Sequence, residues 1–368
     1  MIVNLKSESD LSGFYVVFNG AANLETRGIF GISHLMEHLI CKNFEHLRDD
    51  FEKDGIDWNA FTTQNEIVFF FTGLEKYLSY RRQELVDLIT DFKVDKEQFE
   101  NERKIILQEY KNNFSNQIDS HMFNLNRKLY NTYGAIGLKE DLESLRFMDC
   151  INFFEKQFKN PTKIINVSKS NPFKSDVDFI ENKIDKKFEF GPYNDAILET
   201  SKNYGEKSSL IMCSKLADKE FNTIGFINKM LSSGLSSPLY SEVREKKGLV
   251  YRIRCQQVRM NQQGYSVIHT ETSNKNINQV IDTIKSVLNN PNKFLSKKRF
   301  NLIKSSQKIK LQKERINRFQ NVNNWIIPKD WSVRDIIDTL TYDQVMDVYE
   351  EFFKVDDFYI SEDRTEFT

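Results

Sequence analysis

The sequence predicts an α+β protein made of two tandem, structurally similar domains, each with a β-sheet covered by helices. Its 368 residues suffice for about two domains with separate cores. One order of elements (strand, helix, strand pair, several helices, strand) also occurs twice, in halves of similar length. We place the domains at residues 1–190 and 200–368, because breakers such as Gly191-Pro192 interrupt the polar stretch near 185–200. The alternative to a duplication is an α+β chain whose halves resemble each other by chance.

The first half opens with a strand at 14–18, where β-branched and aromatic residues end at an Asn-Gly turn. A loop leads into a helix at 31–40, and a second long helix begins at Asp95, which is a typical N-cap. Alternation and helical periodicity predict the other elements. These are strands at 59–63, 67–72 and 163–168 and helices at 75–92, 122–130 and 142–158, with the helix that begins at Asp95 reaching residue 110 and beyond.

The second half is predicted by the same signals. Its strands are expected at 210–213, 250–258, 264–270 and 358–360. Its helices are expected at 221–231, 277–288, 296–318, 333–340 and 342–353. This half has no counterpart of the histidine motif described below, so we expect the duplication to carry its functional site on the first copy.

Composition excludes several classes of function. The hydrophobic fraction of 39% and the charged fraction of 29% are ordinary for a globular protein. A net charge of −1 predicts neither nucleic acid nor an anionic membrane as a partner, and no apolar run is long enough for a membrane span. The N-terminal residues lack a basic-then-apolar leader, and the four cysteines form no C-x-x-C pair. We therefore expect a cytoplasmic protein with reduced thiols.

The segment 31–40 contains the motif His-x-x-Glu-His, the inverted form of a zinc-peptidase motif. His34 and His38 are four residues apart, so on a helix they share one face, with Glu37 between them. Two neutral imidazoles make half of a tetrahedral zinc site, and a catalytic site needs a third protein ligand and an open position for water. The alternative is a pair of core histidines, which is the usual fate of a histidine on an apolar helix face.

Two glutamates on the helix that begins at Asp95 are candidates for completing this site. Glu102 and Glu109 are seven residues, or about two turns, apart and therefore project from one face. Apolar neighbours of Glu109 indicate a packed helix, where an unpaired carboxylate would be costly and a zinc ion would be a suitable partner. Glu102 could orient a histidine from behind. The alternative is that both glutamates are solvated.

These motifs resemble the pitrilysin and insulinase family of inverted-motif zinc metallopeptidases, which includes mitochondrial processing peptidase. The resemblance rests on Gly31-x-x-His-x-x-Glu-His and, about seventy residues later, Glu102-Arg-x-x-x-Leu-x-Glu. Segments 55–62, 137–145 and 232–251 resemble further blocks of the family, so the similarity spans both halves. It implies a LuxS/processing-peptidase-like metallohydrolase fold. The segment 39–44 departs from the family pattern, which leaves substrate preference open.

The resemblance also implies roles for individual residues and one zinc ion per chain as cofactor. The implied zinc ligands are His34, His38 and Glu109, the general base is Glu37, and the supporting carboxylate is Glu102. Arg244 and Tyr251 match the family pair that reaches from the second half to the bound peptide. Asn59 and Ala60 match the edge-strand segment that pairs with the substrate backbone.

The implied function is a zinc-dependent endopeptidase that hydrolyses peptides or unfolded polypeptides inside a chamber enclosed by two such units. One unit per chain implies a dimer. We expect a homodimer, since this chain carries both the metal half and the Arg/Tyr half; a heterodimer is the other arrangement. The alternatives are an inactive structural or partner subunit and a peptide-binding module without metal. The presence of all of His34, Glu37, His38 and Glu109 favours an active enzyme.

Overall fold

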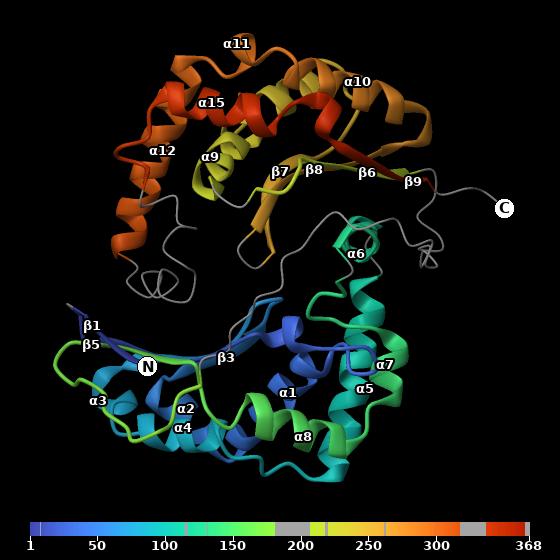
Figure 1. Ribbon diagram of the computed structural model, residues 1–368. Helices are drawn as coiled ribbons and strands as arrows, with labels where there is room; N and C mark the ends of the chain where they lie inside the picture. Colours follow the sequence, from blue (N-terminus) through green and yellow to red (C-terminus); the bar gives the residue numbers. More distant parts are fainter. Residues whose placement is uncertain are drawn as a thin grey trace. The chain divides into compact units, whose positions relative to one another are not determined.

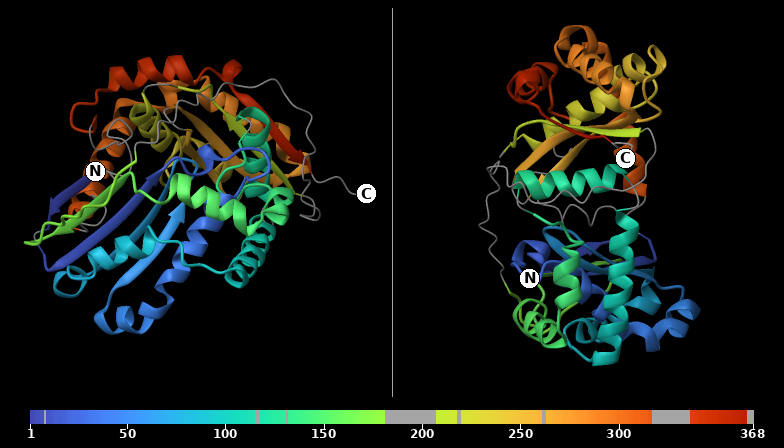
Figure 2. Two further views of the ribbon diagram at one scale, coloured as in Figure 1. Left: turned by 60° about the horizontal axis from the view of Figure 1, so that its bottom comes forward. Right: turned by 90° about the vertical axis from the view of Figure 1, so that its right-hand side faces the viewer.

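The computed structural model describes residues 1–7, 9–114, 117–130, 132–180, 207–217, 220–260, 263–316 and 336–364. They form two compact units (Figures 1 and 2). The first unit holds the described residues of 1–112 and 132–180, and the second holds those of 113–130 and from 207 onward. The stretch 185–200, where we place the domain boundary, lies outside the described residues.

The first unit is built on a five-stranded sheet in the order β1-β5-β2-β4-β3. Its strands are β1 (Ile2–Lys6), β2 (Leu11–Asn19), β3 (Asp57–Thr62), β4 (Glu66–Leu74) and β5 (Lys163–Ser168). All neighbours are antiparallel except β1 and β5, which are parallel. The middle strand β2 is buried on both faces, which explains its unbroken apolar run. At the far end of the order, β3 is an edge strand.

Helices cover one face of this sheet (Figure 1). They are α1 (Ile32–Cys41), α2 (Arg48–Asp54), α3 (Glu75–Leu78), α4 (Arg82–Ile89), α5 (Lys96–Asn113), α7 (Lys139–Ser144) and α8 (Phe147–Gln157). The apolar face of α1 is fully buried, with Leu35, Met36 and Leu39 at 0% exposure. This burial fixes the rotation of α1 about its axis, and so it decides where the polar residues of the same helix point.

The predicted helix at 75–92 is wrong as a single element, since the structure divides it into α3 and α4. The chain turns between them, and Arg81 at this turn bonds to Asp50 and Asp54 with N–O distances of 3.0 and 3.2 Å. These partners lie about thirty residues earlier in the sequence. The helical periodicity of residues 75–92 carries no information about these two distant partners, so it could not predict the turn.

The predicted helix at 142–158 is likewise two helices, α7 and α8. Arg146 is extended, with φ −110° and ψ 154°, and its backbone N–H donates to the carboxylate of Asp149 over 2.9 Å. This is one half of a capping box, in which the side chain of the third helical residue caps the N–H of the residue before the helix, and it starts a new helix at Phe147. A side-chain cap therefore overrides the continuous apolar periodicity.

The second unit contains a four-stranded antiparallel sheet in the order β7-β8-β6-β9. Its strands are β6 (Lys207–Cys213), β7 (Ile253–Met260), β8 (Gln263–Ser273) and β9 (Tyr359–Arg364). One face carries α9 (Phe221–Ser232), α10 (Ile277–Leu288), α11 (Pro291–Phe294), α12 (Lys297–Ile316) and α15 (Tyr342–Phe352). The other face packs against α6 (Gln117–Tyr130), whose Leu125 joins an apolar cluster with Ile211 and Val267.

The two sheets share one topology. The order β5-β2-β4-β3 in the first unit corresponds strand by strand to β9-β6-β8-β7 in the second, and every corresponding pair is antiparallel. The prediction of two similar sheet-and-helix domains is thus confirmed. Strand β1, which the sequence pattern did not predict, has no counterpart among the strands that the structure describes in the second unit.

Three smaller expectations concern the end of the chain, the cysteines and membrane spans. The predicted helix at 333–340 begins outside the described residues; in its described part Ile336 is helical and residues 337–339 form a turn. Cys41, Cys150, Cys213 and Cys255 are all free, as predicted. Among the helices that the structure describes, none has the length and apolarity needed to cross a membrane.

Candidate metal centre

Helix α1 presents His34 and His38 from the face opposite its buried apolar residues. The two rings are perpendicular, with centroids 4.9 Å apart. The helix begins after Gly31, which has φ 98°; a Cβ there would lie 2.8 Å from a side-chain carbon of Leu142. Only glycine fits this conformation and this close approach. The start of α1, and hence the position of both histidines, is therefore fixed by local packing.

Helix α5 brings Glu109 to the same point. Its Oε2 atom lies 3.7 Å from His34 Nε2 and 3.8 Å from His38 Nε2. These distances are too long for hydrogen bonds. They are close to the roughly 3.4 Å that separates two ligands of one tetrahedral zinc ion. The three donor atoms lie within 4.8 Å of one another and are the one group of this kind found among the described residues. The donor set therefore fits a zinc ion.

The environment of Glu109 differs from the sequence-based prediction. We expected a buried carboxylate that needs a partner, but the Glu109 side chain is 43% exposed, and the neighbouring Ile105 is 44% exposed. The packed face of α5 instead buries Phe99, Glu102 and Ile106. The carboxylate of Glu109 thus lies on the solvent side of the two histidines. The buried carboxylate of this helix is that of Glu102.

Glu102 is 3% exposed and lies behind the histidines. Its Oε2 atom is 3.1 Å from His38 Nδ1, and its Oε1 atom is 2.7 Å from Lys42 Nζ. The hydrogen bond to Nδ1 orients the His38 ring so that Nε2 faces Glu109. Lys42 was not among the residues predicted for the site. The sequence signal that could have identified Lys42 is its position four residues after His38, which on a continuing helix places both side chains on one face.

The electrostatics of His34 and Glu37, which lie on α1 with His38, suit a metal site. Burial, together with the neighbouring His38, lowers the pKa of His34 to about 4, so the ring is neutral at pH 7, as a metal ligand must be. Its Nδ1 atom is buried and has no hydrogen-bond partner among the described residues. Burial also raises the pKa of Glu37, which is 8% exposed.

Strand β3 runs beside Glu37. Thr62, at its end, donates a hydrogen bond of 2.5 Å from Oγ1 to Glu37 Oε2. Asn59 and Ala60 lie on the same strand, where Asn59 Oδ1 accepts the backbone N–H of Ala60 over 2.8 Å. Thr62 was also missed as a site residue, although it ends the Asn-Ala-x-Thr pattern within the 55–62 segment of the family resemblance. The edge strand and the carboxylate thus form one continuous site within the first unit.

Arg244 and Tyr251 lie together in the second unit. Arg244 belongs to a single π-helical turn, Tyr240–Glu245, and its guanidinium lies 5.0 Å from the centroid of the Tyr251 ring and 4.7 Å from that of Tyr240. Tyr251 is 79% exposed. The pair thus presents a cation and a phenol to solvent, and its role in contacting a peptide stays a prediction.

Glu25 anchors the start of α1. The side chain is 5% exposed, and its two oxygens accept the backbone N–H groups of Gly31 and Ser33 over 2.7 and 2.8 Å. It therefore satisfies donors that a helix N-terminus leaves without intrahelical partners. Burial raises the pKa of Glu25 to about 7, although the backbone hydrogen bonds oppose this shift. No pattern in the sequence singled out this residue.

This raised pKa predicts a pH-dependent stability difference. Folded Glu25 keeps its proton up to about pH 7, whereas the ordinary value is 4.5, so stability decreases as pH rises through this window. Gln at this position cannot titrate. The free energy of unfolding of the wild type minus that of Glu25→Gln is therefore expected to fall by roughly 3 kcal/mol across the window. Urea denaturation of the metal-free proteins measures it.

The control for this prediction is Glu52→Gln, at an exposed position of α2. Its difference from the wild type is expected to stay constant over the same pH range. A constant difference for Glu25→Gln as well would contradict the assignment of this titration to Glu25.

Two sheet-and-helix domains, with a His-x-x-Glu-His helix on the first, define the class of two-domain, M16-like proteins. The chain belongs to the insulinase, or M16, peptidase family. The family model described as Insulinase (Peptidase family M16) matches residues 2–136. The model described as Peptidase M16 inactive domain matches residues 175–307. The family prediction from the motifs is thus confirmed.

Individual relatives agree with this assignment. An uncharacterized zinc protease of Bacillus subtilis, YmxG, is 24% identical over 289 residues, which are 72% of this chain and 69% of that protein. The crystal structure of a protease from Helicobacter pylori has a TM-score of 0.76 at 15% identity and covers 98% of this chain and 96% of that chain. A chain of Complex III2 from Candida albicans gives 0.74 and 15%, with 98% and 93% covered. These structural likenesses show the shared fold.

Proposed function

We propose that this protein is a zinc-dependent endopeptidase that hydrolyses peptides or unfolded polypeptides. The observation that carries the proposal is the approach of His34, His38 and Glu109 to one point, next to a buried carboxylate on Glu37. A zinc ion held there would supply a Lewis acid and lower the pKa of water from its bulk value toward about 7. The zinc-protease relative supports this choice of metal.

Glu37 is the general base in this proposal. Its carboxylate takes a proton from the attacking water and returns it to the leaving amine of the substrate. Burial raises the pKa of Glu37, which suits a group that must both accept and release a proton near neutral pH. The hydrogen bond from Thr62 holds one carboxylate oxygen, so the other is left for the water.

Substrate binding is assigned to the edge strand β3. An extended peptide would pair with main-chain groups near Asn59 and Ala60, which leads its backbone past Glu37. Such pairing recognises backbone more than side chains, so broad sequence tolerance and a requirement for unfolded segments follow.

Arg244 and Tyr251 are proposed to contact the peptide or its developing oxyanion from the second unit. We also propose a homodimer that encloses the substrate.

The experiment is metal analysis and peptide cleavage with the purified full chain. We expect about one zinc ion per chain, cuts in an unstructured peptide mixture mapped by mass spectrometry, and loss of cutting with 1,10-phenanthroline that zinc restores. The control substrate is a stably folded protein whose amino-acid composition matches that of the peptide mixture, and it should remain intact. A chain that binds zinc but cuts no unstructured peptide would instead support a role as an inactive partner subunit.

A further inference from the structure

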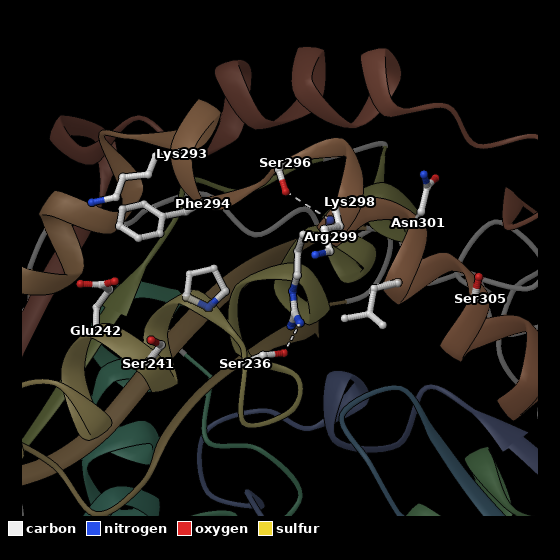
Figure 3. A pocket seen from close by; sticks show the side chains of 12 residues that line it. Ser236, Ser241, Glu242, Lys293, Phe294, Ser296, Lys298, Arg299, Asn301 and Ser305 are labelled. Atoms are coloured by element: carbon white, nitrogen blue, oxygen red, sulfur yellow. Dashed lines mark hydrogen bonds between the residues drawn. The ribbon is translucent and has the colours of Figure 1, made fainter.

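The second unit contains a cavity of about 600 Å³ that shares no residue with the candidate metal centre. Three segments line it: the stretch 236–242 after α9, the stretch 293–296 around the end of α11, and the first turns of α12 (Figure 3). This volume is within the range of small-molecule sites in proteins. The cavity is therefore large enough for a ligand of its own.

The wall of this cavity is positively charged. It includes Lys293, Lys298 and Arg299, against one carboxylate, Glu242. That carboxylate is already paired, since Lys246 Nζ lies 2.6 Å from its Oε1 atom. Both lysines are exposed, so their ammonium groups can move toward a ligand. An anion is the ligand that this distribution of charge favours.

Arg299 is the buried part of this wall, at 8% exposure. Its guanidinium donates to the carbonyls of Met230 and Ser233 at the end of α9, and to Ser236 Oγ over 3.3 Å. Within the described part of the chain no carboxylate pairs with it. The partial negative charge of the helix end offsets only a part of a full cationic charge. A desolvated cation thus remains beside the cavity, where an anion would stabilise it.

Apart from the amide of Asn301, the rest of the lining supplies either hydroxyl groups or apolar surface. Hydroxyl groups are supplied by Ser236, Ser241 and Ser296, which can donate hydrogen bonds to an anion. Apolar surface is supplied by Phe294 and by Leu302, which is 54% exposed. The Lys293 ammonium lies 4.7 Å from the centroid of the Phe294 ring, so charged and apolar surface adjoin. A ligand that matches both is an anionic group attached to an apolar chain or ring.

We propose that this cavity binds an amphipathic anion, a carboxylate or phosphate ester with a short apolar group. The anionic head lies against the basic wall formed by Lys293, Lys298 and Arg299, and the apolar part lies against the apolar surface supplied by Phe294 or Leu302. The site depends neither on zinc nor on peptide cleavage, because none of its residues belongs to the metal centre.

The experiment is calorimetric titration of the metal-free full chain with octanoate and with octyl phosphate. Octylamine, which has the same chain and opposite charge, and inorganic phosphate, which lacks the chain, are the comparison probes. We expect saturable binding of at least one of the two amphipathic anions and none of octylamine. Binding of octanoate alone identifies a carboxylate site, and binding of octyl phosphate alone identifies a phosphate-ester site.

Charge reversal locates the binding. The double variant Lys293→Glu/Lys298→Glu is expected to bind about tenfold more weakly or not at all, because two favourable charges become repulsive. The matched control is Lys275→Glu/Lys354→Glu, which changes the net charge equally at exposed positions outside the cavity and should bind as the wild type does. The proposal is overturned if neither anion binds, if inorganic phosphate binds as tightly as octyl phosphate, or if both double variants weaken binding equally.

Discussion

Replacing Glu37 by Gln is expected to reduce kcat/KM for an unstructured peptide by about 10²–10⁴-fold while zinc stays bound. The amide keeps the size of the side chain and can still accept the hydrogen bond from Thr62. It cannot take a proton from water, so the attacking nucleophile is not generated. Peptide kinetics and zinc content, measured on the same preparation, separate a loss of chemistry from a loss of metal.

The matched control is Glu97→Gln, an exposed position in the first turn of α5 that should cleave as the wild type does. Thermal unfolding of both variants tests for damage to the fold. Wild-type rates for Glu37→Gln would mean that another group acts as the base, and the proposed mechanism would be wrong.

Replacing His34 by Ala is expected to remove zinc from the protein. The change removes one of the three donor atoms and leaves two, His38 Nε2 and Glu109 Oε2, which are 3.8 Å apart. Two ligands do not hold zinc against a competing chelator, so we expect a loss of affinity well beyond the roughly 10–100-fold that a supporting residue contributes. Glu102→Gln should fall within that smaller range, because it weakens the bond that orients His38 and the ion pair with Lys42 but removes no donor atom of the metal site.

Zinc affinity measured by competition with a chromophoric chelator ranks these variants. His46→Ala is the control, since His46 is exposed on the segment that follows α1 and has no place in the donor set. Full zinc occupancy in His34→Ala would refute the ligand assignment. An affinity of Glu102→Gln equal to that of the wild type would refute the orienting role.

Elements that are decided by local pattern were predictable. Strand 163–168 and helix 277–288 match β5 and α10, because apolar residues and breakers mark both ends. Strand β1 was missed because its burial is incomplete and its partner β5 lies about 160 residues later. Parallel pairing over that distance leaves no local signal. The divided helices were missed for a related reason, since side-chain bonds of Arg81 and Asp149 decide where they break.

In the candidate site, too, features that depend on contacts between distant segments could not be predicted from local sequence. Helical spacing predicted that His34 and His38 share a face, and that Glu102 and Glu109 share another. The approach of the two faces depends on how α1 and α5 pack, which neither segment encodes alone. For this reason spacing alone did not show which glutamate meets the imidazoles; the apolar neighbours of Glu109 and the family resemblance suggested it. The burial of Glu102 and the exposure of Glu109 run against their sequence surroundings, since polar and charged residues flank Glu102 and apolar residues precede Glu109.

The hydrogen bond between Asn59 and Ala60 has a consequence for the protein without a bound peptide. An exposed edge strand is a template for pairing with other chains, including further copies of itself. Here the side chain of Asn59 already satisfies the main-chain N–H of Ala60, so any chain that docks there must first displace an internal bond. Strand β3 thus offers one free donor fewer to a passing chain, and a chain that forms several additional main-chain bonds gains enough to replace this internal bond.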